Sequence, residues 1–263
     1  MPFIKWCYQQ HGSPKNPAII LLHGFMGSAE SWKSVTSHLK DSYYCLSLDL
    51  PGHGNTVVTE EASYTMPETA GEIIRLMNDM NIAQSHLIGY SMGGRLALYL
   101  AVRFPDRFKK VILESASPGL KSPQDRKLRR IRDEELATFL EKQGMDLFLK
   151  FWYNQPIFSA LKTNPDFPNI IEQRKNNDPN RLAASLRRMG TGVQPSLWKD
   201  LERVSVPILL LVGEKDQKFR NISSQMSALS KNIRTEIIEN SGHTIHIENE
   251  KKYVTEIKKF LGK

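Results

Sequence analysis

Short apolar runs separated by stretches with helical spacing are the main pattern along the chain. Runs rich in Ile, Leu, Val and aromatic residues occupy positions 18–22, 43–48, 85–90, 110–113, 206–212 and 234–238. Their length and composition indicate buried strands. Amphipathic patterns at 28–39, 66–80, after residue 91, and from about 248 to 261 indicate helices. This alternation predicts an α/β fold in which helices flank a mainly parallel central sheet.

The alternation stops between residues 117 and 203. This segment is charged, has a helical pattern interrupted by Pro and Gly, and contains no convincing strand. Because open α/β sheets bind ligands at the carboxyl ends of their strands, we interpret it as a helical cap inserted over those ends. The predicted domains are a core of residues 1–116 and 204–263 and a cap of residues 117–203.

The motif that carries chemistry is Gly89-Tyr90-Ser91-Met92-Gly93, between a predicted strand and a predicted helix. A sharp turn of this kind exposes a strained serine above the sheet, and the two glycines let strand and helix approach closely. We therefore predict that Ser91 is the reactive serine. The N–H of Met92, at the helix N-terminus, is predicted to stabilise an oxyanion. The alternative is a Gly/Ser turn that only starts a helix.

Two further polar residues follow late strands of the predicted sheet. Asp216 comes after the run at 206–212, and His243 comes after the run at 234–238. The chain order Ser91, Asp216, His243 is the order found in proteins with this serine turn. The three residues are therefore predicted to form a catalytic triad. The alternative is a chance coincidence of residue types that all favour loops.

Other polar residues compete for the same roles. Phe25, in the loop after the first run, is predicted to donate the second oxyanion N–H. His23 is a rival base and Asp49 a rival acid, but their places beside early strands favour structural roles. His246, three residues beyond His243, is predicted to be structural or at the rim of the site.

The chain is basic, with 36 Lys and Arg against 28 Asp and Glu, for a formal charge of +8. Such a charge suits nucleic acid, an anionic membrane surface or an anionic small molecule. The sequence has no nucleic-acid-binding module and no basic stripe interleaved with aromatic residues. These observations favour a pocket for an anionic small molecule, with the remaining charge solvating the surface.

Composition limits the location and the cofactors that we expect. The cysteines Cys7 and Cys45 give neither a disulfide framework nor a metal-ligand spacing and are predicted to be buried free thiols. No signal-peptide pattern and no apolar run of about 18 residues is present. We therefore expect a cytoplasmic protein that is a monomer or weak oligomer, has no membrane span, and uses no metal or organic cofactor.

Several motifs together resemble the α/β-hydrolase superfamily. They are the serine turn, His23-Gly24-Phe25, and the segments at 49–54, 213–216 and 242–243. This fold hosts many reactions, so the resemblance alone fixes no activity. Further segments indicate a particular family within this superfamily. They are residues 117–120, Arg129 with its neighbours, and residues 151–158, 190–198 and 213–219. These segments resemble the menaquinone-pathway lyases called 2-succinyl-6-hydroxy-2,4-cyclohexadiene-1-carboxylate synthases, the MenH family.

The resemblance implies an elimination reaction. The implied substrate is 5-enolpyruvyl-6-hydroxy-2-succinyl-3-cyclohexene-1-carboxylate, which loses pyruvate to give a cyclohexadiene of the menaquinone or phylloquinone pathway. Ser91, assisted by His243, would remove a carbon-bound proton, and Asp216 would orient His243. The amides of Phe25 and Met92 would stabilise an enolate-like oxyanion.

The implied substrate carries three carboxylates, which suit the planar fork of arginine. The resemblance implies that Arg95, Arg129 and Arg174 bind these carboxylates, and that Tyr90 and Trp152 form pocket walls or donate hydrogen bonds. From the residues alone, Arg129 would belong to a solvated helix face and Trp152 equally to packing in the core.

Two other functions remain open from the sequence. The first is a serine hydrolase that cleaves esters, or carbon–carbon bonds in vinylogous diketones, with Ser91 as nucleophile or water activator. The second is a receptor on this fold that binds a ligand without catalysis; an intact triad does not exclude it but gives it no support.

Overall fold

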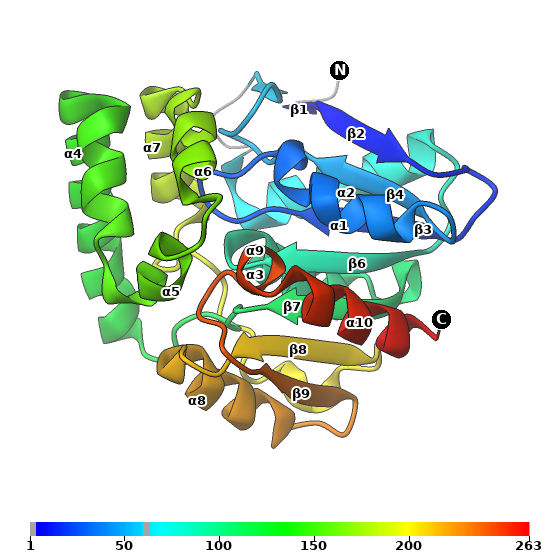
Figure 1. Cartoon of the computed structure of the whole chain (residues 1–263). Coiled ribbons are helices and arrows are strands. Elements are labelled where there is room, and N and C mark those ends of the chain that lie inside the picture. Colours follow the sequence, from blue (N-terminus) through cyan, green and yellow to red (C-terminus); the bar gives the residue numbers. More distant parts are fainter. Residues whose placement is uncertain (1–3, 60–63, 263) are drawn as a thin grey trace.

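The computed structural model describes residues 4–59 and 64–262. Residues 1–3, 60–63 and 263 belong to the predicted core but lie outside the described residues. The central element is a seven-stranded sheet in which all neighbouring pairs are parallel except the pair of β2 with β4 (Figure 1). The strand order is β2 (Tyr8–His11), β4 (Tyr44–Leu48), β3 (Ala18–Leu22), β6 (Ser85–Tyr90), β7 (Phe108–Glu114), β8 (Ile208–Gly213), β9 (Ile233–Ile238). The predicted fold class is confirmed.

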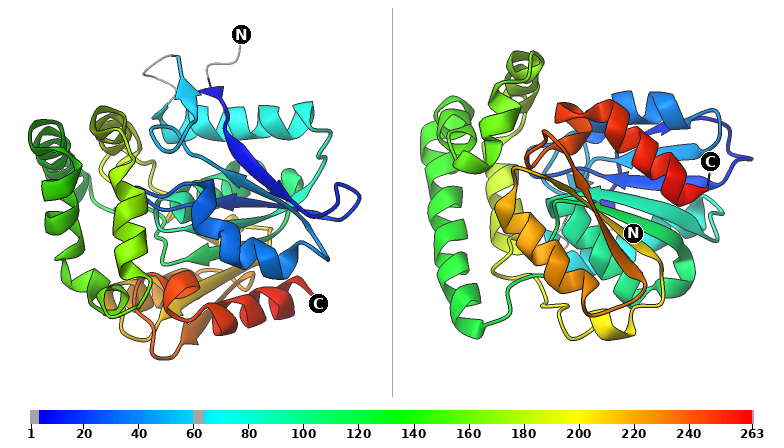
Figure 2. Two further views of the ribbon diagram at one scale, coloured as in Figure 1. Left: turned by 45° about the horizontal axis from the view of Figure 1, so that its top comes forward. Right: turned by 60° about the horizontal axis from the view of Figure 1, so that its bottom comes forward.

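Helices cover both faces of this sheet because the buried strands present apolar side chains on both sides. On β3, Ile19 and Leu21 join the apolar cluster formed with α1 (Lys33–Leu39) and α10 (Glu250–Leu261). Ile20 and Leu22 join the cluster on the opposite face. That face is covered by α2 (Met66–Asp79), α3 (Met92–Arg103) and α8 (Gln217–Ser227), and Figure 2 shows the three layers from two directions.

The chain between β7 and β8 is helical and contains no strand. Its helices lie beyond the carboxyl ends of the parallel strands (Figures 1 and 2). They are α4 (Pro123–Tyr153), α5 (Ser159–Lys162), α6 (Phe167–Lys175) and α7 (Pro179–Met189), with 3-10 turns η4 (Pro156–Phe158) and η5 (Leu201–Arg203). α4 is interrupted at Gly144, whose φ of 71° is not helical. Met26, from the loop after β3, packs into the apolar cluster of these helices.

The structure differs from the expected elements at one edge of the sheet, before the last helix and in the helix expected at 28–39. The strand β2 was not predicted, because its sequence Tyr-Gln-Gln-His has no apolar run and pairs at the sheet edge with β4 only. The last helix begins at Glu250 rather than at residue 248, since the non-helical Asn249 separates it from α9 (Ile245–Glu248). The helix expected at 28–39 divides into a 3-10 turn, η1 (Ala29–Trp32), and α1.

The remaining small elements lie around the sheet. β1 (Ile4–Lys5) and β5 (Val57–Val58) form a two-stranded antiparallel ribbon, and a 3-10 turn, η3 (Pro105–Arg107), precedes β7. Cys45 is buried, as expected, whereas Cys7 is only half-buried, and both thiols are free. Within residues 4–59 and 64–262, no helix is long and apolar enough to cross a membrane.

Candidate active site

Ser91 lies at the sharp turn between β6 and α3. Its backbone has φ 49° and ψ −104°, a conformation that costs free energy for a residue with a side chain and is typical of functional turns. A side chain on Gly89 would collide with the backbone of Gly93, and one on Gly93 would collide with the carbonyl of Leu22. The two glycines therefore allow the close packing that holds this turn in place.

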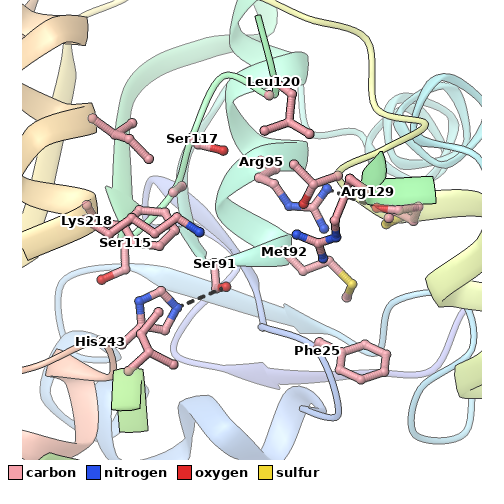
Figure 3. A pocket seen from close by; sticks show the side chains of 18 of the residues that line it. Phe25, Ser91, Met92, Arg95, Ser115, Ser117, Leu120, Arg129, Lys218 and His243 are labelled. Atoms are coloured by element: carbon pink, nitrogen blue, oxygen red, sulfur yellow. Dashed lines mark hydrogen bonds between the residues drawn. The ribbon is translucent and has the colours of Figure 1, made fainter. Parts of the chain in front are cut away.

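His243 and Asp216 extend a hydrogen-bonded chain from Ser91. The Nε2 atom of His243 lies 3.3 Å from the Ser91 hydroxyl oxygen, and its Nδ1 atom lies 2.7 Å from a carboxylate oxygen of Asp216 (Figure 3). His243 and Asp216 are both about 95% buried. The second carboxylate oxygen of Asp216 accepts a hydrogen bond from the backbone N–H of Phe219 at 3.2 Å, which fixes the carboxylate. A serine, a histidine and a carboxylate in this order can move a proton.

The rival residues are held elsewhere by structural hydrogen bonds. His23 donates from Nδ1 to the carbonyl of Gly24 at 2.7 Å and accepts at Nε2 from the N–H of Leu50 at 2.9 Å. Burial lowers the pKa of His23 to about 3, so the ring is neutral. The carboxylate of Asp49 accepts from the backbone N–H groups of Ala29 and Asn55 at 2.7 and 2.8 Å. Both residues fix loops beside the site.

A buried carboxylate, that of Glu114, contacts the segment that carries His243 and His246. Glu114, at the end of β7, is fully buried and contacts Nδ1 of His246 at 2.8 Å. His246, predicted to be structural or at the rim, is thus a buried structural residue. The ring of Tyr90 packs against both His246 and His243, with centroid separations of 4.8 and 5.5 Å. Glu248 accepts hydrogen bonds from the N–H groups on either side of His243. These contacts set the position of the His243 imidazole.

The triad opens into a cavity of about 230 Å³ beneath the cap. Phe25 and Met92, the predicted oxyanion donors, both line this cavity together with Ser91 and His243. Met92 is the first residue of α3, so its N–H has no acceptor within the helix. The apolar part of the lining comes from both core and cap and includes Ala116, Leu120, Trp152, Ile157, Phe158, Leu186, Met189, Phe219 and Ile222.

Two arginines of the predicted set project into the same cavity (Figure 3). Arg95 donates to the carbonyl of Met189 at 2.9 Å and to the Gln194 side-chain oxygen at 2.8 Å. Burial, with a smaller effect from the neighbouring Arg129 charge, lowers the pKa of Arg95 to about 10. Arg129 is held from Nε by the carboxylate of Asp133 at 2.8 Å. Each arginine is thus oriented by a protein contact, which suits the binding of planar anions.

The other predicted binding residues have different places. Trp152 lines the main cavity, whereas Tyr90 does not and donates or accepts a hydrogen bond with the Thr244 hydroxyl at 2.9 Å. Arg174 is also outside the main cavity lining. Its guanidinium donates to the carbonyl of Met26 at 2.7 Å and to the Ser31 hydroxyl. Tyr90 and Arg174 instead line a smaller adjoining space of about 40 Å³ that also touches Ser91.

Sequence analysis did not single out Lys218, which the structure adds to the cavity lining. It is the second residue of α8. A signal was present, because a cation in the first turn of a helix opposes the helix dipole and needs another reason to be there. Ser117 and Gln155 also line the cavity and were not identified as binding residues. Within the described residues, no group of three or more His, Cys, Asp or Glu side chains could hold a metal ion.

Comparisons with known proteins identify the family to which the chain is similar. Residues 17–250 match the family described as the alpha/beta hydrolase fold. A 2-succinyl-6-hydroxy-2,4-cyclohexadiene-1-carboxylate synthase from Escherichia coli O1:K1 is 31% identical over 240 residues, which cover 91% of this chain and 92% of that protein. A Bacillus subtilis protein provisionally named as the same synthase is 35% identical over 261 residues, covering 98% and 95%. The solved structure of MenH from S. aureus has a TM-score of 0.92 and 32% identity, and the match covers 97% of each chain.

Proposed function

The chain belongs to the 2-succinyl-6-hydroxy-2,4-cyclohexadiene-1-carboxylate synthase family on the α/β-hydrolase fold, and from this premise we propose that the Ser91 site eliminates pyruvate from a cyclohexene tricarboxylate. The enzyme is a lyase of menaquinone or phylloquinone biosynthesis. Its substrate is 5-enolpyruvyl-6-hydroxy-2-succinyl-3-cyclohexene-1-carboxylate. The observation that carries the proposal is a hydrogen-bonded Ser91–His243–Asp216 chain that opens on a cavity lined by arginines.

The reaction begins with removal of a proton from the ring carbon beside the succinyl ketone. Ser91 takes this proton while its own hydroxyl proton passes to Nε2 of His243, across the 3.3 Å contact. The ring electrons shift, the bond between the ring carbon and the enolpyruvyl oxygen breaks, and the ring gains a second double bond. The leaving enolate takes up a proton to become pyruvate. No water and no acyl-enzyme are required.

Two features of the site support proton removal from carbon. Removing a proton beside a ketone places negative charge on the ketone oxygen. Phe25 and Met92, whose N–H groups are the proposed donors to this oxygen, both line the cavity. Asp216 stabilises the imidazolium that forms on His243 and holds the tautomer that presents Nε2 to Ser91. The same donors could stabilise an ester intermediate, so the triad alone does not select the reaction.

The cationic lining is what favours a polycarboxylate over a neutral ester. Arg95 and Arg129 both line one cavity of about 230 Å³. Arg95 is oriented by neutral acceptors, and Arg129 is oriented from Nε by its ion pair with Asp133. We assign both as carboxylate-binding residues. Trp152 is assigned as a wall of the same cavity. Arg174 and Tyr90 are assigned to the adjoining space, where Arg174 holds the loop that carries Phe25 through the carbonyl of Met26.

The test is pyruvate release from the freshly prepared enolpyruvyl substrate by wild-type protein and by Ser91→Ala. We expect rapid release by the wild type and a rate within about tenfold of the spontaneous reaction for the variant, because the proton acceptor is lost. Circular dichroism would show that the variant is folded. Spontaneous rates with folded wild-type protein would refute the lyase assignment.

A second variant separates the lyase from an ester hydrolase on the same triad. Arg129→Ala should lower kcat/KM for pyruvate release by about 10- to 100-fold, the effect expected for losing a charged hydrogen bond. Hydrolysis of a small neutral ester by the same variant should change less than about threefold. If both reactions fell equally, Arg129 would act on the triad and not on substrate charge.

A further inference from the structure

Lys218 approaches the cavity from the side opposite to the arginines. Figure 3 shows its ammonium group extending from α8 towards the space above Ser91, while the Arg95 and Arg129 guanidinium groups enter from the other side. Lys218 lines the cavity and is also exposed to solvent. A ligand above Ser91 would therefore lie between one lysine and two arginines.

The ammonium of Lys218 lacks a protein acceptor. Across residues 4–59 and 64–262, its Nζ atom has no hydrogen-bond or salt-bridge partner, and its ring contact is with Phe219, 5.4 Å away. The two cavity arginines differ, since Arg95 bonds to Gln194 and Arg129 to Asp133. Three hydrogen-bond donors of one cation thus remain available to a ligand.

The electrostatic surroundings of Lys218 are unfavourable for a cation in the empty cavity. Crowding by protein atoms, and then the charge of Arg129, lower the pKa of Lys218, while Asp216 acts in the opposite direction. Lys218 and Arg129 are like charges that line one cavity, and they repel each other. An anion between Lys218 and Arg129 would remove this repulsion and raise the pKa of Lys218, so anion binding and lysine protonation are coupled.

We propose that Lys218 is a specificity-determining residue that binds one carboxylate of the substrate from the side opposite to Arg95 and Arg129. The proposal rests on the proposed function, because it is the tricarboxylate that requires a third cation. Arg95, Arg129 and Lys218 then supply three cations for three carboxylates.

The experiment compares Lys218→Met and Lys218→Arg with wild type, with Lys215→Met as the matched control. Lys215 is an exposed lysine in the loop that leads into α8, and it is not part of the cavity lining. For Lys218→Met we expect the KM for pyruvate release to rise by about 10- to 100-fold, with kcat within about threefold of wild type. Lys218→Arg keeps the charge and should recover most of the affinity. Lys215→Met should behave as wild type.

The pH dependence of KM gives a readout that a packing role would not change. In the wild type, KM should rise with pH as Lys218 loses its proton. Because the pKa of Lys218 is lowered, this rise should begin at a lower pH than for a lysine with an ordinary pKa. In Lys218→Arg this rise should move to higher pH, since arginine stays protonated. A KM within twofold of wild type for Lys218→Met, or an equal loss for Lys218→Met and Lys218→Arg, would overturn the proposal.

A binding measurement separates this proposal from the proposed function. Calorimetry with 2-succinylbenzoate, a stable analogue that keeps the ring and succinyl carboxylates but lacks the leaving group, needs no turnover. Weaker binding to Lys218→Met would assign Lys218 to a carboxylate kept in the product. Unchanged binding with a raised KM would assign it to the leaving group. Unchanged binding and unchanged KM would refute the role of Lys218, whereas absence of pyruvate release by the wild type would refute the lyase assignment alone.

Discussion

Asp216 determines which nitrogen of His243 faces Ser91. Its carboxylate accepts the Nδ1 proton at 2.7 Å and is itself held by the Phe219 N–H, so Nε2 is left without a proton and can accept one from serine. The geometry requires an acceptor at this position, because an amide NH2 there would favour the opposite tautomer.

Asp216→Asn is therefore expected to lower kcat for pyruvate release by roughly 10³- to 10⁴-fold with little change in KM. The amide keeps the shape of the carboxylate but can donate to Nδ1, which moves the imidazole proton to Nε2 and removes the base. Steady-state kinetics and a thermal melt would be measured together. A fall in kcat of less than about tenfold in a stably folded variant would show that His243 does not depend on Asp216 for its tautomer.

The turn that carries Ser91 requires a glycine at position 93, where the first turn of α3 lies against the backbone of β3. Gly93, in the first turn of α3, lies against the backbone of β3, and its N–H donates to the carbonyl of His23 at 3.1 Å. A Cβ atom at this position would overlap the carbonyl of Leu22. The contacting atom belongs to a central strand, so it cannot move without disturbing the sheet.

Gly93→Ala should lower the free energy of unfolding by at least about 2 kcal/mol, because overpacking against backbone forces the helix and strand apart. The matched control is Gly71→Ala in α2, where a Cβ would meet no atom within 4 Å. That change should raise the free energy of unfolding by about 0.5–1 kcal/mol through helix propensity. Urea denaturation followed by circular dichroism gives both values, and equal effects of the two substitutions would contradict the packing argument.

The strands of the parallel sheet were predictable because each is a nearly continuous apolar run buried on both faces. β3 and β8 are fully buried from end to end, and both were expected from their sequences. β2 was not, because an edge strand paired on one side needs little apolar surface and its residues are mostly half-exposed. The break at Asn249 was also missed, since it depends on the hydrogen bonds of Glu248 to the His243 loop rather than on local periodicity.

The site was predictable where a motif fixes position relative to a strand end. Ser91, Asp216 and His243 each follow a strand of the sheet, so the fold brings them together. The cap residues were harder, because their positions depend on how α4 and α6 pack over the core. Arg174 donates a hydrogen bond to the Met26 carbonyl and is not part of the main cavity lining, whereas Lys218 is. The spacing of residues along the sequence predicts neither placement.

At the scale of the whole molecule, three buried histidines remain neutral in the folded protein. His23, His53 and His86 are 1%, 0% and 7% exposed. Burial lowers the pKa of His23 to about 3 and that of His86 to about 4, and it lowers the pKa of His53 well below its usual value. In the unfolded chain all three titrate near pH 6.5. As the pH falls below this value, the unfolded chain binds protons that the folded protein does not, and the folded state loses stability.

Each histidine should therefore reduce the free energy of unfolding by about 1.4 kcal/mol per pH unit below pH 6, and the three together by about 4 kcal/mol per unit. Typical totals are roughly 5–15 kcal/mol, so a fold near the low end of that range would be lost near about pH 5, above the pH of about 4 at which surface carboxylates protonate. Urea denaturation at pH 7, 6, 5.5 and 5 would measure the slope. His86→Leu is the control, because Nδ1 of His86 has no hydrogen-bond partner within the described residues and its loss removes one proton-binding site from the unfolded chain. The slope should fall by about a third in this variant, and an unchanged slope would mean that groups other than the buried histidines set the acid limit of the fold.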